Sequence, residues 1–150
     1  MFSNIELNAY PTVHLHDCII SDCYFDDQSV TFCFNDGINF NTNSKTQGSA
    51  EIELNNVTLN DISFFKINPI RIIKGLLPIY YVKHISAIQL LKLLRKGYQF
   101  RIEDEYYNGN SMAWRGSILF KKKKQCRLKG FFEIDLNSYR EPNRVYKYNL

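Results

Sequence analysis

Alternation of apolar and polar residues dominates the last third of the chain, and it constrains the fold more than any other feature of the sequence. Three such segments follow one another, and their apolar members are Tyr98, Phe100, Ile102, Met112, Trp114, Ile118, Phe120, Cys126, Leu128, Phe132, Ile134 and Leu136. A period of two places alternate side chains on one face of a β-strand. We therefore predict a three-stranded antiparallel meander over 98–136.

The register of this meander follows from the loop between its first two strands. A three-residue loop places Ile102 opposite Gly116 and Asp104 opposite Trp114, so that the apolar faces agree. A two-residue turn would place Ile102 opposite Arg115 instead. We therefore expect the three-residue loop with a bulge at the loop itself, and Asp104 on the apolar face beside Trp114.

A separate hairpin is predicted in the first third of the chain. Residues 17–25 and 30–40 alternate in the same way, and the polar residues 26–29 between them are a turn signal. The expected register sets Cys23 opposite Phe32 and gives a core face of Ile19, Cys23, Phe25, Val30, Phe32 and Phe34. Two further strands are expected over 52–59 and 62–67.

One helix is predicted between the early strands and the meander, over about 86–96. Ser86 and Gln89 have the spacing of a capping box, and Gly97 follows as a stop signal. The stripe expected to face the core consists of Ile88, Leu90, Leu91 and Leu94. The predicted fold class is therefore α+β and β-rich, with one or two antiparallel sheets of six to eight strands packed against one main helix. Residues 1–150 are read as a single domain.

The N-terminal segment, the apolar stretches and the cysteines together indicate a cytoplasmic protein. The first residues, MFSNIELNAYP, lack the basic opening and apolar stretch of a signal peptide. The most apolar region, 70–82, falls short of the ~20 apolar residues that a membrane span requires. The four cysteines form no CxxC pair and are expected to be reduced. The abundance of Asn, Ile, Lys, Phe and Tyr is typical of an AT-rich coding genome, here taken as bacterial.

A run of four lysines, 121–124, is the most visible charge feature of a chain whose net charge is +4. One interpretation is a nucleic-acid site, in which Lys121, Lys122, Lys123, Lys124, Arg127 and Lys129 contact phosphates. The other is a solvated hairpin tip that prevents edge-to-edge aggregation. Exposed aromatic residues for base stacking are not interleaved with the lysines, which favours the second interpretation.

His14, His16 and Cys18 occupy alternate positions near the start of the first hairpin. On one continuous strand they would point to the same side, and these residue types suit zinc. The alternative is a half-exposed polar start of the strand. No cofactor fingerprint such as a P-loop, HExxH, GxSxG or Rossmann motif occurs, and no cofactor is expected.

Asp104 is the candidate for acid–base chemistry. A carboxylate on the apolar face beside Trp114, and near Tyr106, would have a raised pKa and could line a small-ligand pocket or an active site. The alternative is a solvated carboxylate at the edge of the sheet.

The tail carries Tyr139, Arg140, Arg144, Tyr146 and Tyr148. Tyrosine and arginine are favoured at protein interfaces, which makes these residues candidates for partner binding. A last strand packed on the domain would show the same residues.

The first 40 residues resemble a known class of proteins. The segment Leu15-His16-Asp17-Cys18-Ile19, followed by a hairpin ending Phe34-Asn35-Asp36-Gly37, is similar to the opening of small bacterial domains that include immunity-type proteins of polymorphic toxin systems. The resemblance implies a β-rich cytoplasmic domain that binds and neutralises a partner protein without catalysis. The leading expectation is therefore a protein-binding module. Nucleic-acid binding through 121–124 is the alternative, a pocket or enzyme around Asp104 and Trp114 the third, and no membrane association is expected.

Overall fold

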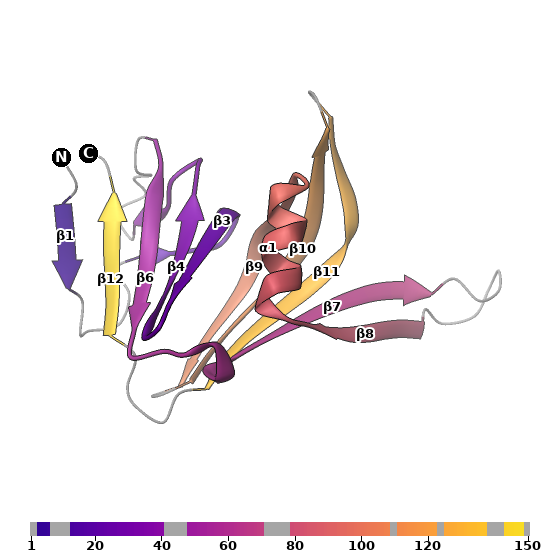
Figure 1. The fold of residues 1–150 in the computed structure, drawn as a ribbon. Coiled ribbons are helices and arrows are strands. Elements are labelled where there is room, and N and C mark those ends of the chain that lie inside the picture. Colours follow the sequence, from indigo (N-terminus) through magenta and orange to yellow (C-terminus); the bar gives the residue numbers. More distant parts are fainter. Residues whose placement is uncertain are drawn as a thin grey trace.

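The computed structural model describes residues 3–6, 13–40, 48–70, 79–108, 111–122, 125–137 and 143–148. The strands are β1 (Ser3–Glu6), β2 (Val13–His14), β3 (Ile19–Asp26), β4 (Ser29–Phe34), β5 (Asn39–Phe40), β6 (Ala50–Asn55), β7 (Ile62–Ile70), β8 (Ile79–Ile85), β9 (Tyr98–Asn108), β10 (Ser111–Lys122), β11 (Gln125–Asn137) and β12 (Asn143–Tyr148). A 3-10 turn covers Leu59–Asp61, and the helix α1 covers Ala87–Arg95 (Figure 1).

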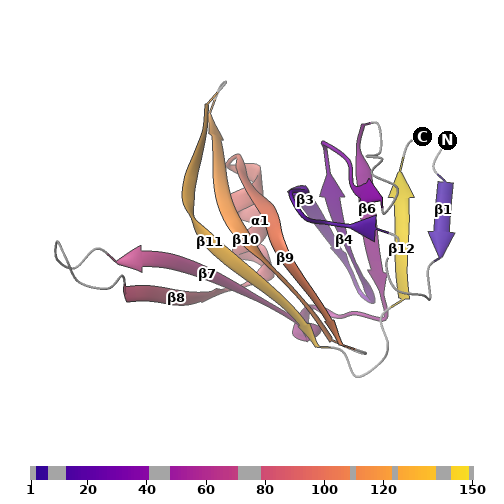
Figure 2. The same cartoon turned by 180° about the vertical axis from the view of Figure 1, so that it is seen from behind.

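The main sheet is antiparallel and follows the order β1-β12-β6-β4-β3-β9-β10-β11-β7-β8, while β2 and β5 form a small separate sheet. The predicted α+β, β-rich class is confirmed. The main sheet has ten strands, more than the six to eight expected, because β1 and β12 extend it at one end and β8 at the other. In both views the sheet folds into two arms, and α1 packs against β3 of one arm and β9 of the other (Figures 1 and 2).

The two arms meet between β3 and β9, where only Ile19 and Ile20 pair with Arg101 and Phe100. Such a short ladder lets the sheet bend sharply, and the two inner faces pack on each other. The ring of Phe32 on β4 contacts the ring of Trp114 on β10 edge-on, with centroids 5.0 Å apart. The core therefore lies inside the fold of the sheet, and both of these rings are fully buried.

The helix forms where the sequence predicts it. The hydroxyl of Ser86 accepts a hydrogen bond from the backbone N–H of Gln89, and the Oε1 of Gln89 accepts one from the backbone N–H of Ser86, which completes the capping box. Leu90 and Leu94 are buried against the sheet. Ile88, which we expected in the core, is 65% exposed, because the contact stripe is narrower than the apolar run.

The β3–β4 hairpin has the predicted register at its tip, where Cys23 pairs with Phe32. A bulge at Ser21 shifts the alternation nearer the start of β3, since Ile20 pairs with Phe34 and Asp22 with Cys33. Ile20 consequently takes the buried position that we assigned to Ile19. No disulfide links the four cysteines, and Cys18, Cys23 and Cys33 are buried.

The meander β9–β10–β11 is also confirmed, but its register contains a bulge that we did not predict. Ile102 pairs with Gly116 as expected, whereas Asp104 pairs with Arg115 and Glu105 with Trp114. Glu103 is the extra residue of β9, and the pairing of Asn108 with Ser111 leaves two residues between the strands. The apolar faces are brought into line by a bulge within β9 rather than by a longer loop.

Within the residues that the structure describes, no helix has the length and apolar character needed to cross a membrane.

Candidate functional site

The bulge in β9 exchanges the roles of two neighbouring carboxylates. Asp104 is exposed and pairs with Arg115, so its expected place on the apolar face beside Trp114 is wrong, and the alternative of a solvated carboxylate agrees with its exposure. Glu105 occupies the inner position instead, and only 12% of its side chain is exposed. A one-residue slip moves every later side chain of a strand to the other face, which accounts for the exchange.

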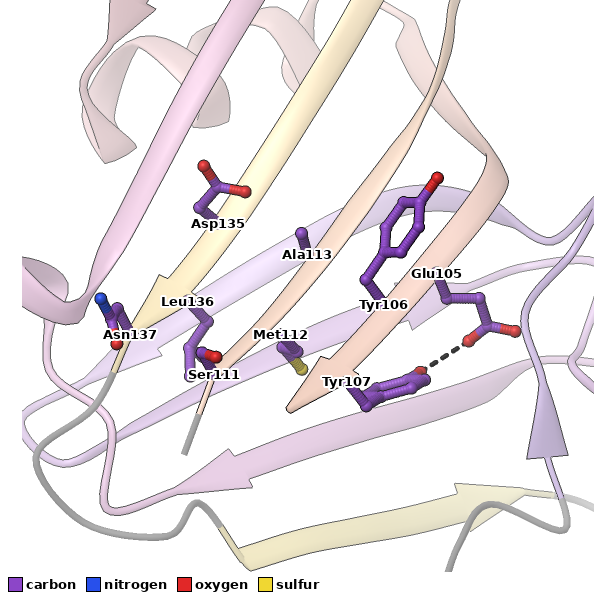
Figure 3. Close-up of a pocket in the computed structure, with 9 residues that line it drawn as sticks. All are labelled: Glu105, Tyr106, Tyr107, Ser111, Met112, Ala113, Asp135, Leu136 and Asn137. Carbon is purple, nitrogen blue, oxygen red and sulfur yellow. Dashed lines mark hydrogen bonds between the residues drawn. The ribbon is translucent and has the colours of Figure 1, made fainter. Parts of the chain in front are cut away.

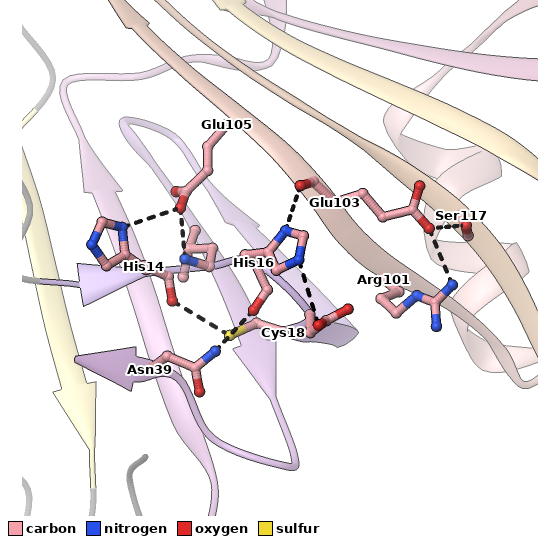
Figure 4. A network of polar contacts seen from close by, with 10 residues as sticks. His14, His16, Cys18, Asn39, Arg101, Glu103, Glu105 and Ser117 are labelled. Carbon is pink, nitrogen blue, oxygen red and sulfur yellow. Dashed lines mark hydrogen bonds and ion pairs between the residues drawn. The ribbon is translucent and has the colours of Figure 1, made fainter. Parts of the chain in front are cut away.

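Glu105 is held by groups from two distant parts of the chain (Figures 3 and 4). Its Oε1 accepts a 2.8 Å hydrogen bond from the backbone N–H of Leu15, and its Oε2 accepts one of 2.6 Å from the hydroxyl of Tyr107. The Nε1–H of Trp114 in turn donates to that hydroxyl at 3.4 Å. Since both carboxylate oxygens are engaged by the protein itself, Glu105 fastens residues before β3 to β9.

A shallow pocket of about 590 Å³ lies at this end of β9, β10 and β11 (Figure 3). Its lining residues are Glu105, Tyr106, Tyr107, Ser111, Met112, Ala113, Asp135, Leu136 and Asn137. Tyr106 therefore lies at the pocket as expected. Asp104 and the buried Trp114 do not line it, so of the three predicted pocket residues only Tyr106 is at this pocket.

On the outer face beside the pocket, charged groups are paired. The Nε of Arg115 lies 2.7 Å from Oε2 of Glu133, and its guanidinium lies over the ring of Tyr106, 5.3 Å from the centroid. Burial raises the pKa of Asp135 above its ordinary value, the nearby Glu133 raises it further, and Arg115 opposes both.

The proposed zinc ligands do not converge (Figure 4). Asp17 has a φ of 62°, so the chain turns between His16 and Cys18 and the expected alternation is interrupted. His14 lies 4.0 Å from Glu105, His16 contacts the carbonyl of Glu103 at 2.6 Å, and Cys18 is buried. Among the described residues, no three His, Cys, Asp or Glu side chains are grouped closely enough to hold a metal ion. The prediction of a shared side for these three residues is therefore wrong.

The lysine-rich hairpin is placed partly within the described residues. Lys121, Arg127 and Lys129 are exposed, Lys122 ends strand β10, and Lys123 and Lys124 lie outside the described part. The backbone N–H of Lys121 donates to the carbonyl of Gly97 at 3.1 Å, which places this hairpin beside the C-terminal end of α1.

The tail residues are described only in part. Arg144, Tyr146 and Tyr148 lie on β12, which pairs with both β1 and β6, while Tyr139 and Arg140 lie outside the described residues. The interpretation of the tail as a last strand packed on the domain is therefore confirmed for 143–148. The proposal that these residues bind a partner stays a prediction.

An exposed apolar surface that we did not predict lies on the β7–β8 hairpin. Tyr80, Tyr81 and Val82 of β8 are 53%, 52% and 55% exposed. The hairpin projects from the rest of the molecule, and β8 is the last strand of the sheet (Figure 1). The available signal was three consecutive apolar residues in a strand, which we weighed only as part of a membrane span.

The apolar surface continues from β8 across β7 to β11 through cross-strand pairs. Val82 pairs with Ile67, and Ile67 pairs with Phe131 on β11, so these side chains form a row on one face. In the next row, the ring of Phe65 packs edge-on against that of His84 at 5.4 Å. Figure 2 shows this face of the arm from the side that α1 does not cover. Tyr80 lies on the same face, two residues from Val82. We call the apolar side chains of this face together, Phe65, Ile67, Tyr80, Val82 and Phe131, the outer apolar row.

The opposite face of the same hairpin is basic. Lys66 on β7 and Lys83 on β8 are directly opposite each other, and Tyr81 pairs with Asn68 farther out. Like charges that face each other across a β-ladder are destabilising. The β7–β8 hairpin therefore presents apolar side chains on one face and a pair of facing cations on the other.

Comparison of the chain with protein-family models, with curated proteins and with solved structures finds no match.

Proposed function

We propose that this chain is a protein-binding module that takes up an extended segment of a partner protein as an additional strand along β8. The observation that carries the proposal is the group of consecutive residues Tyr80, Tyr81 and Val82, each more than half exposed, on the edge strand of a ten-stranded sheet. Exposed apolar edges favour association with another chain, and natural proteins normally cover or charge them.

The two faces of β8 define the chemistry of that partner segment. Side chains of an added strand alternate between the faces of the sheet. On one face they would continue the outer apolar row beside Tyr80 and Val82. On the other they would lie beside Lys83, where an acidic side chain offsets the repulsion between Lys66 and Lys83. The segment we propose therefore alternates apolar and acidic residues.

The resemblance of the first 40 residues to immunity-type domains suggests the consequence of binding. We propose that the partner is a cytoplasmic protein in a bacterial cell and that binding neutralises it without catalysis. Adding a strand along the exposed edge of β8 involves association only and no catalytic step, which agrees with a binding role.

Site-specific crosslinking tests the proposal. A photo-crosslinking amino acid is placed at position 82 in one variant and at position 88, an apolar site on α1 that is also more than half exposed, in a second. Capture from native lysate in high salt with nuclease should yield one stoichiometric protein from position 82 only. Equal capture from both positions, or from neither, would contradict the proposal.

The identified protein is then titrated onto the wild type, onto Tyr80→Ser/Val82→Ser and onto Ile88→Ser. We expect the double variant to lose about tenfold in affinity, since two exposed anchors are removed, and Ile88→Ser to bind as the wild type does. Hydrogen exchange of residues 79–85 should slow on binding. An unchanged affinity for the double variant would exclude β8 as the binding edge.

A further inference from the structure

Basic residues are concentrated in two segments of this chain that are far apart in the sequence. Residues 86–102 and 116–132 contain ten of the nineteen Lys and Arg residues and none of the fifteen Asp and Glu residues. The remainder of the chain therefore has nine cations against fifteen carboxylates. The net charge of +4 conceals this strong separation of charge.

The tertiary structure brings these two segments together. The hydrogen bond from Lys121 to the Gly97 carbonyl joins the end of α1 to the β10–β11 hairpin, and this hairpin extends past that end of the helix (Figure 1). Lys92, Arg95 and Lys96 are exposed and follow the spacing that places side chains on one side of a helix.

The hairpin contributes cations to the face on which the helix lies. Arg127 pairs with Phe120, and Phe120 pairs with Tyr98, so the three side chains share one face of the sheet. The Nζ of Lys129 lies 6.0 Å from the centroid of the Phe120 ring on this face. We define the basic face as the five exposed cations Lys92, Arg95, Lys96, Arg127 and Lys129.

We propose that the basic face binds the phosphate backbone of a nucleic acid without reading its sequence. Several cations that follow two adjacent elements, with no carboxylate in either segment, match a row of phosphates. Two aromatic residues of this face, Tyr98 and Phe120, are half-buried, and their ring centroids lie 4.8 Å apart. Their rings are therefore occupied by packing, and contacts to phosphates rather than base stacking supply the affinity.

This site is independent of the proposed protein-binding edge, because its five cations lie in or directly after α1 and on β11 rather than on β8. Fluorescence anisotropy of a labelled 20-nucleotide single strand of mixed sequence tests it between 50 and 300 mM salt. For four to five phosphate contacts we expect the logarithm of the binding constant to fall against the logarithm of salt with a slope of about −3.

Matched variants locate the contacts. Arg127→Gln/Lys129→Gln should lower the affinity about tenfold at 50 mM salt and make the slope shallower by one to two. Lys92→Gln/Arg95→Gln should do the same from the helix, which keeps the test valid if either variant folds poorly. The control Lys66→Gln/Lys83→Gln removes the same charge from the β7–β8 hairpin and should change the affinity less than twofold.

Three results would overturn the proposal. One is the absence of binding at 50 mM salt. A second is an equal loss of affinity in the control variant, which would show that the affinity depends on the net charge of the protein and not on the basic face. The third is binding to vesicles that contain phosphatidylserine together with no binding to the oligonucleotide, which would assign the basic face to a membrane surface.

Discussion

The carboxylate of Glu105 accepts a hydrogen bond, 2.8 Å long, from the backbone N–H of Leu15, a residue 90 positions earlier in the chain. Two backbone bonds nearby run between Asp17 and Ile102 and between Ile102 and Cys18, at 2.8 and 2.9 Å. The regular ladder between the two arms of the sheet covers only two residue pairs. Glu105 therefore extends the connection between the arms by a side chain where the ladder has ended.

Glu105→Gln should destabilise the fold. An amide has one oxygen where the carboxylate has two, so either the Leu15 N–H or the Tyr107 hydroxyl loses its acceptor in a partly buried place. We expect the free energy of unfolding in urea to fall by about 1–2 kcal/mol. The matched change at the exposed neighbour, Asp104→Asn, should remain within about 0.5 kcal/mol of the wild type. Equal effects of the two changes would contradict the inner position of Glu105.

Gly116→Ala should be among the most damaging small substitutions. A Cβ at this position would lie 1.9 Å from the carbonyl oxygen of Arg101, across the bulge of β9. We expect a loss of about 3 kcal/mol or more in unfolding free energy, because backbone has to move. Gly48→Ala is the control, since its φ is +84° and no atom of the described residues lies within 4 Å of a Cβ there. Its cost should be about 1–2 kcal/mol, from conformation alone. A smaller loss at Gly116 than at Gly48 would argue against this register.

Asp135→Asn should stabilise the protein at neutral pH. Burial, followed by the charge of Glu133, raises the pKa of Asp135 above its ordinary value of 3.8. The folded state thus holds this proton more tightly than the unfolded state, so ionisation of Asp135 lowers stability as the pH rises above 3.8. Thermal unfolding should give a higher Tm for the variant at pH 7, and the difference should vanish near pH 3, where both states are protonated. A gain that persists at pH 3 would have another origin.

Thiol chemistry should distinguish one cysteine from the other three. Cys126 is exposed, whereas Cys18, Cys23 and Cys33 are buried. Burial, with nearby carboxylates, raises the pKa of Cys23 and of Cys33 to about 12, so little thiolate forms there at neutral pH. An aromatic disulfide reagent at pH 8 should label one thiol per native chain rapidly and four in denaturant. Cys126→Ser should abolish the rapid phase, and its persistence would show that an inner cysteine is accessible.

Local signals in the sequence were sufficient for several elements. The capping box of Ser86 and Gln89, the pairing of Cys23 with Phe32 and the three strands of the meander were all predicted correctly. Each depends on residues close together in the chain, such as a cap three positions away or a turn between two alternating segments. The bulges at Ser21 and Glu103 were not predicted, because the position of a bulge depends on the register with the neighbouring strand.

The sequence by itself determined the α+β, β-rich class, the helix, the first hairpin and the meander, because periodicity and capping act over a few residues. Only the tertiary structure decided which carboxylate is inside, which apolar strand is left at the edge, and which cations gather. Glu105 faces inward because of one extra residue in β9, and β8 is exposed because no described strand pairs beyond it. These properties arise from contacts between segments up to 90 residues apart, and alternation within a segment carries no record of its distant neighbours.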